Sequence, residues 1–130
     1  MEYYLENFHI DIDRCTNIKK EFDYAILVHK CFKNKYEYSN NEWFIIENNQ
    51  KIKDIKTENL QNDIKNIISD IFVERSKYWE MQGKKEKDEN IKSDYEIKCS
   101  MLMNSANKIK TNQIFIKNII KECKSFFNNE

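Results

Sequence analysis

The sequence contains no proline and only one glycine in 130 residues. Phosphate-binding loops of the Walker A type and dinucleotide-binding fingerprints both need several glycines at fixed spacing. Neither motif can therefore be present. The shortage of glycine and proline also disfavours doubly wound α/β enzymes, barrels rich in tight turns and collagen-like repeats. These absences exclude the common nucleotide-binding enzymes but do not indicate a function.

Net charge, long apolar runs and paired cysteine motifs are lacking as well. Twenty-two basic residues balance 22 acidic residues, and no apolar run approaches the roughly 20 residues that span a bilayer. Cys15, Cys31, Cys99 and Cys123 have no metal-finger spacing, and no secretory signal opens the chain. We therefore expect reduced cysteines, no metal site, no cofactor, no membrane contact and a cytoplasmic protein.

Enough apolar residues are present for a modest core. Leu, Ile, Val and Phe supply 33 residues, about a quarter of the chain, whereas disordered chains usually have less than roughly 20%. The length suits one domain over residues 1–130. The 20 lysines, 19 isoleucines and 17 asparagines are typical of A/T-rich coding, which weakens any inference from lysine counts alone.

Hydrophobic spacing predicts a mainly helical chain with a small three-stranded antiparallel β-meander after the first helix. Thr57 is expected to cap the long helix that ends at Gly83, and Thr111 to cap the last helix. The expected organisation is an N-terminal arm or short strand (1–18), a unit of helix, meander and long helix (19–83), a charged linker (84–94) and C-terminal helices (95–130).

No catalytic constellation can be identified in the sequence. Acid–base and nucleophilic catalysis need partners gathered around a pocket, and the chain has only His9 and His29. Both histidines lie among apolar residues, where a packing role is the commoner one. Asp11 and Asp13 alternate as metal-binding pairs sometimes do, but this pattern is more typical of one face of a strand. We therefore predict that this chain alone is not an enzyme.

The neutral net charge hides an uneven distribution. Residues 1–24 carry a net charge of −3 and residues 98–124 carry +5. The expected last helix places lysines on one face, where they can follow the phosphates of DNA or simply be solvated. Tyr36, Tyr38 and Trp43 could stack on unpaired bases or belong to the core. The candidate DNA-binding residues are Lys110, Lys117, Lys121 and Lys124.

Two blocks resemble a known family. They are DYAILVHKCFKNKYEYSNNEWFIIENNQKIKDI (23–55) and IKTNQIFIKNIIKECKSFF (109–127). They look like the domain that precedes the AAA+ helicase in poxvirus-type superfamily-three helicase–primases of large nucleo-cytoplasmic DNA viruses and some phages. The spacing from Thr111 to Phe115 is one residue longer than in that pattern, and a second tryptophan is replaced near Ile52. The matching positions are Asp23, Tyr24, Trp43, Phe44, Thr111, Phe115, Glu122 and Cys123.

The resemblance implies a non-catalytic accessory domain. The ATPase of that family needs a Walker loop, an acidic strand and an arginine supplied in trans, and these 130 residues contain no such loop. The implied role is to join primase and helicase, to form a collar on the ring and to guide DNA. The implied partners are the AAA+ helicase and primase modules and DNA. The implied location is the host-cell cytoplasm or a viral replication site.

Two other functions remain compatible with the pattern. Helices beside a small β-meander also describe a winged-helix-like DNA-binding regulator, whose recognition helix enters the major groove. A helical protein-interaction or scaffold module is the other alternative. In that case, an oligomer could form through a surface around Trp79, Met101 and Met103.

Overall fold

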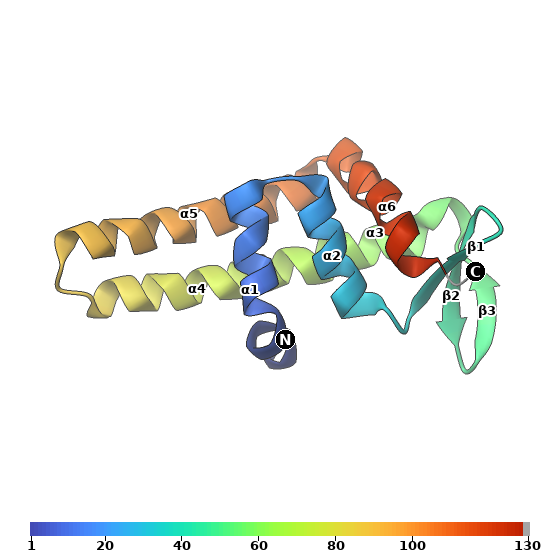
Figure 1. Cartoon of the computed structure of the whole chain (residues 1–130), viewed down its shortest axis with the longest axis horizontal. Helices are drawn as coiled ribbons and strands as arrows, with labels where there is room; N and C mark the ends of the chain where they lie inside the picture. Colours follow the sequence, from blue (N-terminus) through green and yellow to red (C-terminus); the bar gives the residue numbers. More distant parts are fainter. Residues whose placement is uncertain (129–130) are drawn as a thin grey trace.

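The computed structural model describes residues 1–128 and is mainly helical, with an open three-stranded sheet at one end (Figure 1). The predicted fold class is thus confirmed. The sheet follows the second helix rather than the first, because residues 2–18 are also helical. The elements are α1 (Glu2–Ile18), α2 (Glu21–Phe32), β1 (Tyr36–Ser39), β2 (Glu42–Glu47), β3 (Gln50–Lys53), the 3₁₀ turn η1 (Ile55–Thr57), α3 (Glu58–Asp63), the π-helical turn η2 (Ile64–Ile68), α4 (Ser69–Lys85), α5 (Glu89–Thr111) and α6 (Gln113–Phe127).

Helix α1 replaces the expected arm or strand over residues 1–18. Its buried side chains include Ile12 and Cys15, and Leu5 and Phe8 pack partly against the core. Phe8 has non-helical dihedrals (φ −122°, ψ 17°), so the helix is kinked there and its apolar spacing is interrupted. This kink is one reason why no regular period is visible in the sequence.

Two acidic residues of α1 also interrupt its apolar spacing. They lie on the side of the helix that packs against the rest of the molecule, where they form ion pairs with other helices. Asp11 accepts from Lys30 Nζ on α2 at 2.9 Å. Asp13 binds the Arg75 guanidinium of α4 through both carboxylate oxygens, at 3.0 and 2.7 Å. Trp79 Nε1 lies 3.4 Å from the same carboxylate. These contacts attach α1 to the rest of the molecule.

Asparagine occupies the turn positions of the β-meander at which glycine is common in other proteins. Asn40 and Asn41 have φ values of 53° and 61°, and Asn48 and Asn49 have 50° and 63°. Positive φ at both central residues is the type I′ arrangement that matches the twist of antiparallel strands. Asparagine tolerates this conformation better than most side chains. The strands pair in the order β1-β2-β3, and both pairs are antiparallel.

The start of α3 is stabilised by Asp54 rather than by the expected cap, Thr57. The Asp54 carboxylate accepts hydrogen bonds from the backbone N–H groups of Asn59 and Leu60, both at 3.0 Å. Thr57 itself has a left-handed backbone with φ of 55° and makes no capping bond. Helix α3, turn η2 and helix α4 then continue as one rod, because Ile64 and Ser69 at the junctions are right-handed helical.

The expected charged linker over residues 84–94 is mostly helical. Helix α4 continues past Gly83 to Lys85, and α5 already begins at Glu89. Asp88 caps α5, since its side chain accepts from the backbone N–H of Asn90 at 2.9 Å. The result is a long α4–α5 hairpin with a short connection, which projects away from the sheet in Figure 1.

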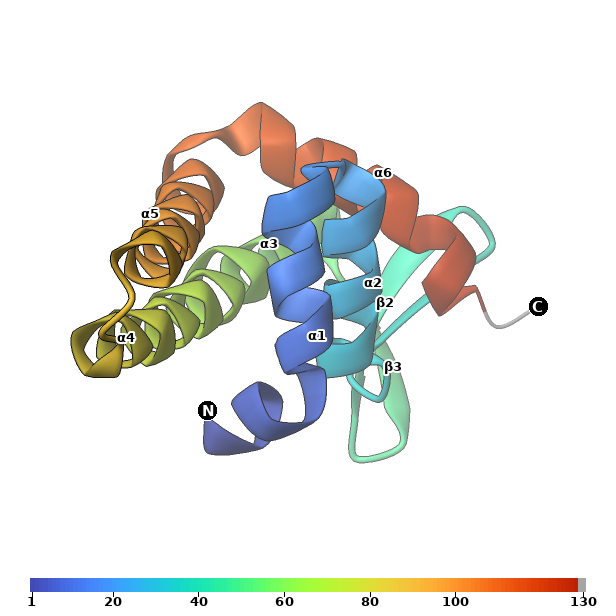
Figure 2. The same ribbon diagram turned by 60° about the vertical axis from the view of Figure 1, so that its left-hand side comes forward.

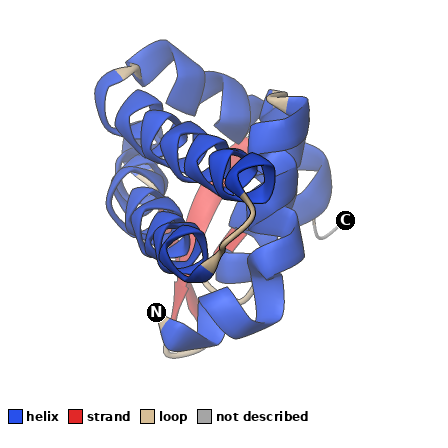
Figure 3. Ribbon diagram, turned by 90° about the vertical axis from the view of Figure 1, so that its left-hand side faces the viewer, coloured by secondary structure: helices blue, strands red, loops and turns tan. Residues whose placement is uncertain are grey.

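The core lies where α1, α2 and α6 cover the parts of α4 and α5 that are nearest to the sheet. Figure 2 shows the strands as a small layer at one end, and in Figure 3, which looks from the opposite end, they lie behind the helices. The predicted apolar stripes of the long rod and of α6 are buried here. Fully buried side chains include Ile12, Leu27, Leu60, Ile64, Ile68, Ile71, Phe72, Leu102, Ile109, Ile116 and Ile119.

Candidate nucleic-acid interface

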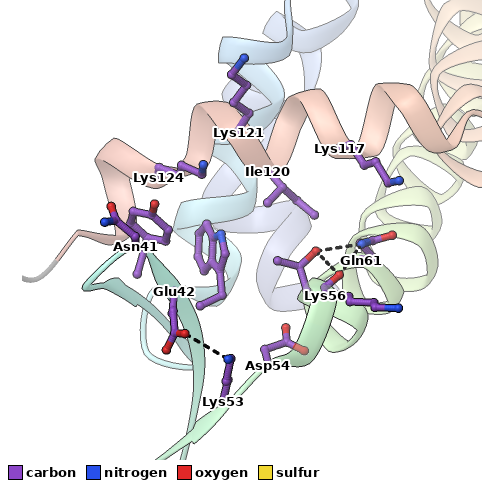
Figure 4. A pocket seen from close by; sticks show the side chains of 13 residues that line it. Asn41, Glu42, Lys53, Asp54, Lys56, Gln61, Lys117, Ile120, Lys121 and Lys124 are labelled. Carbon is purple, nitrogen blue, oxygen red and sulfur yellow. Dashed lines mark hydrogen bonds and ion pairs between the residues drawn. The ribbon is translucent and has the colours of Figure 1, made fainter.

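A groove of about 470 Å³ lies between α6 and the β-meander (Figure 4). One wall is α6, and the other consists of the strands, η1 and the start of α3. Five lysines line it against two carboxylates. We call it the basic groove, and its lining residues are Tyr38, Asn41, Glu42, Trp43, Lys53, Asp54, Lys56, Thr57, Gln61, Lys117, Ile120, Lys121 and Lys124.

The position of α6 follows from its cap and its apolar stripe. The Asn112 side chain accepts a hydrogen bond from the Phe115 backbone N–H at 3.0 Å and caps the helix. Thr111, which was expected to cap it, is the last residue of α5 and donates to the Asn107 carbonyl at 2.8 Å. The side chains of Ile116, Ile119, Ile120, Cys123 and Phe127 are then buried, with Ile120 at the floor of the groove.

Three of the four predicted lysines come together on α6. Lys117, Lys121 and Lys124 all line the basic groove. In Figure 4 the Lys117 and Lys124 side chains run along the groove side of the helix, whereas the Lys121 ammonium points away. Within residues 1–128, none of these three lysines forms an ion pair with a carboxylate. The sequence predicted that Lys110 shares their face, and this is wrong, because Lys110 belongs to α5 and precedes the start of α6.

Two aromatic side chains form the meander end of the groove. The rings of Tyr38 and Trp43 are 5.2 Å apart, and Trp43 packs on Phe127 of α6 at 5.3 Å. Tyr38 is half-buried, and Lys124 Nζ lies 5.4 Å from its ring centre. Trp43 is 6% exposed, and its indole N–H is the one buried side-chain nitrogen or oxygen without a partner among the described residues.

The opposite wall contains two lysines that no pattern in the sequence indicated. Lys53 of β3 pairs with Glu42 at 3.0 Å, and Lys56 lies in turn η1. Lys56 and Thr57 both have φ of 55°, and left-handed backbone of this kind typically costs about 1–3 kcal/mol per residue. The Gln61 side chain holds the turn, donating to the Lys56 carbonyl and to Thr57 Oγ1 at 2.8 Å each. This strained turn keeps Lys56 opposite α6.

A second hollow continues the path beyond Gln61. It shares Lys56, Gln61 and Lys117 with the basic groove and adds Lys65 of η2. One acidic residue, Glu58, lies on its rim. Positive charge therefore extends along the surface from Lys124 to Lys65.

Most positions of the family-like pattern lie in the core and not in the basic groove. The Tyr24 hydroxyl hydrogen-bonds with Ser105 Oγ at 3.0 Å, and burial raises the pKa of Tyr24 to about 12. Its ring meets Phe115 edge to face at 4.9 Å. Cys123 Sγ lies 4.0 Å from the Ala25 carbonyl. Asp23 is buried, Phe44 is half-buried and Glu122 is exposed. Of these residues, Tyr24, Phe115 and Cys123 make the contacts that hold α2 against α6.

The two histidines have different partners. His29 packs on Phe126 and Phe127, and burial lowers its pKa. His9 Nδ1 lies 3.1 Å from the Glu6 carbonyl of the same helix. Over residues 1–128 there is no group of three His, Cys, Asp or Glu side chains able to hold a metal ion. Nor does any helix in this part of the chain have the length and apolar character needed to cross a bilayer.

Comparisons of the chain with protein-family models, with curated proteins and with solved structures gave no significant match. The geometry of the basic groove is therefore the main basis for a functional conclusion.

Proposed function

We propose that this chain is a non-catalytic accessory domain that holds the phosphate backbone of a nucleic acid in the basic groove. The observation that carries the proposal is the convergence of Lys117, Lys121 and Lys124 with Lys53 and Lys56 from the opposite wall. These two walls are more than 50 residues apart in sequence and become one surface only in the folded chain.

The electrostatics of the groove support phosphate as the ligand. The α6 lysines have no carboxylate partner within residues 1–128, so they remain available to an external anion. Glu42 is engaged by Lys53, and Asp54 is engaged by the backbone of α3. Each phosphate neutralised by a lysine releases counterions, which makes binding favourable at low salt and weak at high salt.

The resemblance in blocks 23–55 and 109–127 supports a more specific role. In that role the chain joins the primase and AAA+ helicase modules of a viral replication system and directs DNA toward the helicase. It would act in the host-cell cytoplasm or at a viral replication site, without a cofactor and without hydrolysing ATP itself. Co-purification with the AAA+ and primase modules of the same genome tests this role, and no association with either module would contradict it.

Fluorescence anisotropy with a labelled 12-nucleotide strand tests nucleic-acid binding directly. The variant K117Q/K121Q/K124Q removes three positive charges from α6. A matched control, K85Q/K87Q/K92Q, removes three from the α4–α5 hairpin. We expect the groove variant to lower the slope of log affinity against log salt by about 2, since each phosphate contact contributes about 0.7 for a single strand. Equal losses in both variants would contradict the proposal.

A scaffold function is the second candidate, because the α4–α5 hairpin exposes apolar side chains. Met81 and Ile97 are each 56% exposed, and Met103 is 45% exposed. Trp79 and Met101, expected on the same surface, are half-buried. Analytical ultracentrifugation over a concentration series distinguishes the two functions: a dimer that forms without nucleic-acid affinity favours the scaffold. A defined motif selected from random duplex DNA would instead favour a winged-helix-like regulator.

A further inference from the structure

Lysine side chains line both walls of the basic groove. Lys117 and Lys124 line the α6 wall, and Lys53 and Lys56 line the wall opposite. In Figure 4, Lys56 and Lys117 lie on opposite sides of the Gln61 side chain. A phosphate can lie between the two walls only if its nucleic-acid strand enters the groove. The shape of the groove therefore favours a single strand over a duplex.

We infer that the ligand of the basic groove is single-stranded nucleic acid, with its phosphates between Lys117, Lys124 and Lys56 and one base on Tyr38. This inference rests on the proposed function and names the class of ligand. It also assigns different tasks to the two ends of the groove. The lysines bind the backbone, and the meander end binds a base.

The surroundings of α6 argue against duplex DNA at the same lysines. A recognition helix must stand clear of its domain to enter a major groove that is about 12 Å wide. Helix α6 instead packs on α2 through Tyr24 and Cys123, and its lysine-bearing flank faces the meander and α3. Duplex DNA would meet the rims of the groove without reaching both walls.

The aromatic end provides a place for a base. Tyr38 is half-buried, with Trp43 on one side and the Lys124 ammonium over its ring. An unpaired base can stack on such a ring directly, whereas a base in a duplex must first break its pairing and stacking, which costs free energy. Trp43 adds an indole N–H that has no acceptor among residues 1–128, and an oxygen atom of the ligand could satisfy it.

The test compares a fluorescein-labelled thymidine 12-mer with a 12-base-pair duplex at low salt. The variants are Tyr38→Leu, which removes the ring, Tyr38→Phe, which keeps it, and K117Q/K124Q. We expect the strand to bind at least about tenfold more tightly than the duplex. Tyr38→Leu should weaken strand binding by about tenfold, Tyr38→Phe should leave it nearly unchanged, and duplex binding should respond to neither.

Trp43 provides an independent readout that does not require a substitution in the groove. Trp79→Phe leaves Trp43 as the one tryptophan, because the chain has only two. We expect the 12-mer to quench its emission and the duplex to have little effect. This measurement stays informative if Tyr38→Leu fails to fold.

The outcomes separate the inference from the proposed function. Duplex affinity equal to that of the strand, with the same dependence on Lys117 and Lys124, would overturn the inference and leave the proposed function intact. Unchanged Trp43 emission at saturating strand would likewise overturn the placement of the base. Binding of neither probe above the level of the K117Q/K124Q variant would overturn both.

Discussion

The two ends of the molecule are built differently. At the groove end, α1, α2 and α6 cover the long rod, and side chains such as Phe72, Ile68 and Ile116 are completely buried. In the distal α4–α5 hairpin, residues 77–99, the two helices pack chiefly on one another, and α1 reaches the segment at Trp79. Gly83 is its one buried residue, with the Tyr95 Cβ 3.7 Å from the position that a Gly83 Cβ would occupy.

The two ends also treat charge differently. Residues 77–99 contain six lysines and six acidic residues, and pairs such as Lys84 with Glu80 neutralise one another along the helix. The basic groove has an excess of lysine, and its α6 lysines have no carboxylate partner within residues 1–128. The lysines are therefore not distributed uniformly, although the composition is typical of A/T-rich coding. Acidic residues neutralise them in the solvated hairpin, whereas lysines outnumber acidic residues in the basic groove.

The largest expected difference between the ends is in core substitutions. Phe72→Ala removes a fully buried ring that lies 5.6 Å from Tyr24, and should cost about 3–5 kcal/mol of unfolding free energy. Ile97→Ala, at an exposed position of the hairpin, should change the unfolding free energy by less than about 0.5 kcal/mol. Urea denaturation measures both, and similar losses would show that the hairpin shares the core.

Cysteine alkylation at pH 8 should sharpen the same contrast. Burial raises the pKa of the Cys15 and Cys123 thiols, and raises the pKa of Cys31 to about 12. A raised pKa lowers the fraction of the thiol that is present as the reactive thiolate. A buried thiol also reacts only when local unfolding exposes it. Burial also raises the pKa of Cys99 on α5, but this thiol is only half-buried, so we expect it to react about a hundredfold faster than Cys123. Peptide mass spectrometry during labelling gives the order, and equal rates would contradict it.

Arg75 lies where the two ends meet, and its loss should have an intermediate effect. Its guanidinium binds Asp13 twice and stacks on Tyr78 and Trp79, with ring-centre distances of 4.3 and 5.0 Å. Arg75→Ala should cost about 1–3 kcal/mol, and Arg75→Lys should recover only part, because lysine lacks the two-pronged geometry. Thermal unfolding checks both variants, and full recovery by lysine would show that charge alone matters.

The smallest expected effect is at the second meander turn. Asn49 has φ of 63°, so Asn49→Gly should stabilise the protein slightly or leave it unchanged, whereas Asn49→Ala should cost about 1 kcal/mol. Lys85→Ala, in the exposed last turn of α4, is the matched hairpin control and should have almost no effect. Urea denaturation detects these differences, and a stabilising Asn49→Ala would contradict the turn assignment.

The elements whose signals are local were predictable. The apolar stripes of residues 60–72 and 116–127, and the paired asparagines of the meander, each act within a few residues of chain. The capping residues were less predictable. The side chain that stabilises the start of α3 is Asp54, three residues before the predicted Thr57, and the side chain that caps α6 is Asn112, one residue after the predicted Thr111. Several residues near a helix start can cap it, and packing selects among them.

The sequence by itself determined the helical class, the meander and the helix that carries Lys117, Lys121 and Lys124, because periodicity and turn preferences act between neighbouring residues. Tertiary structure decided that residues 2–18 are a helix, since Asp11 and Asp13 are balanced by the distant Lys30 and Arg75. It also decided the groove itself. Lys56 and Lys117 line the same groove only because the meander folds back beside α6, and such long-range proximity leaves no local pattern in a sequence.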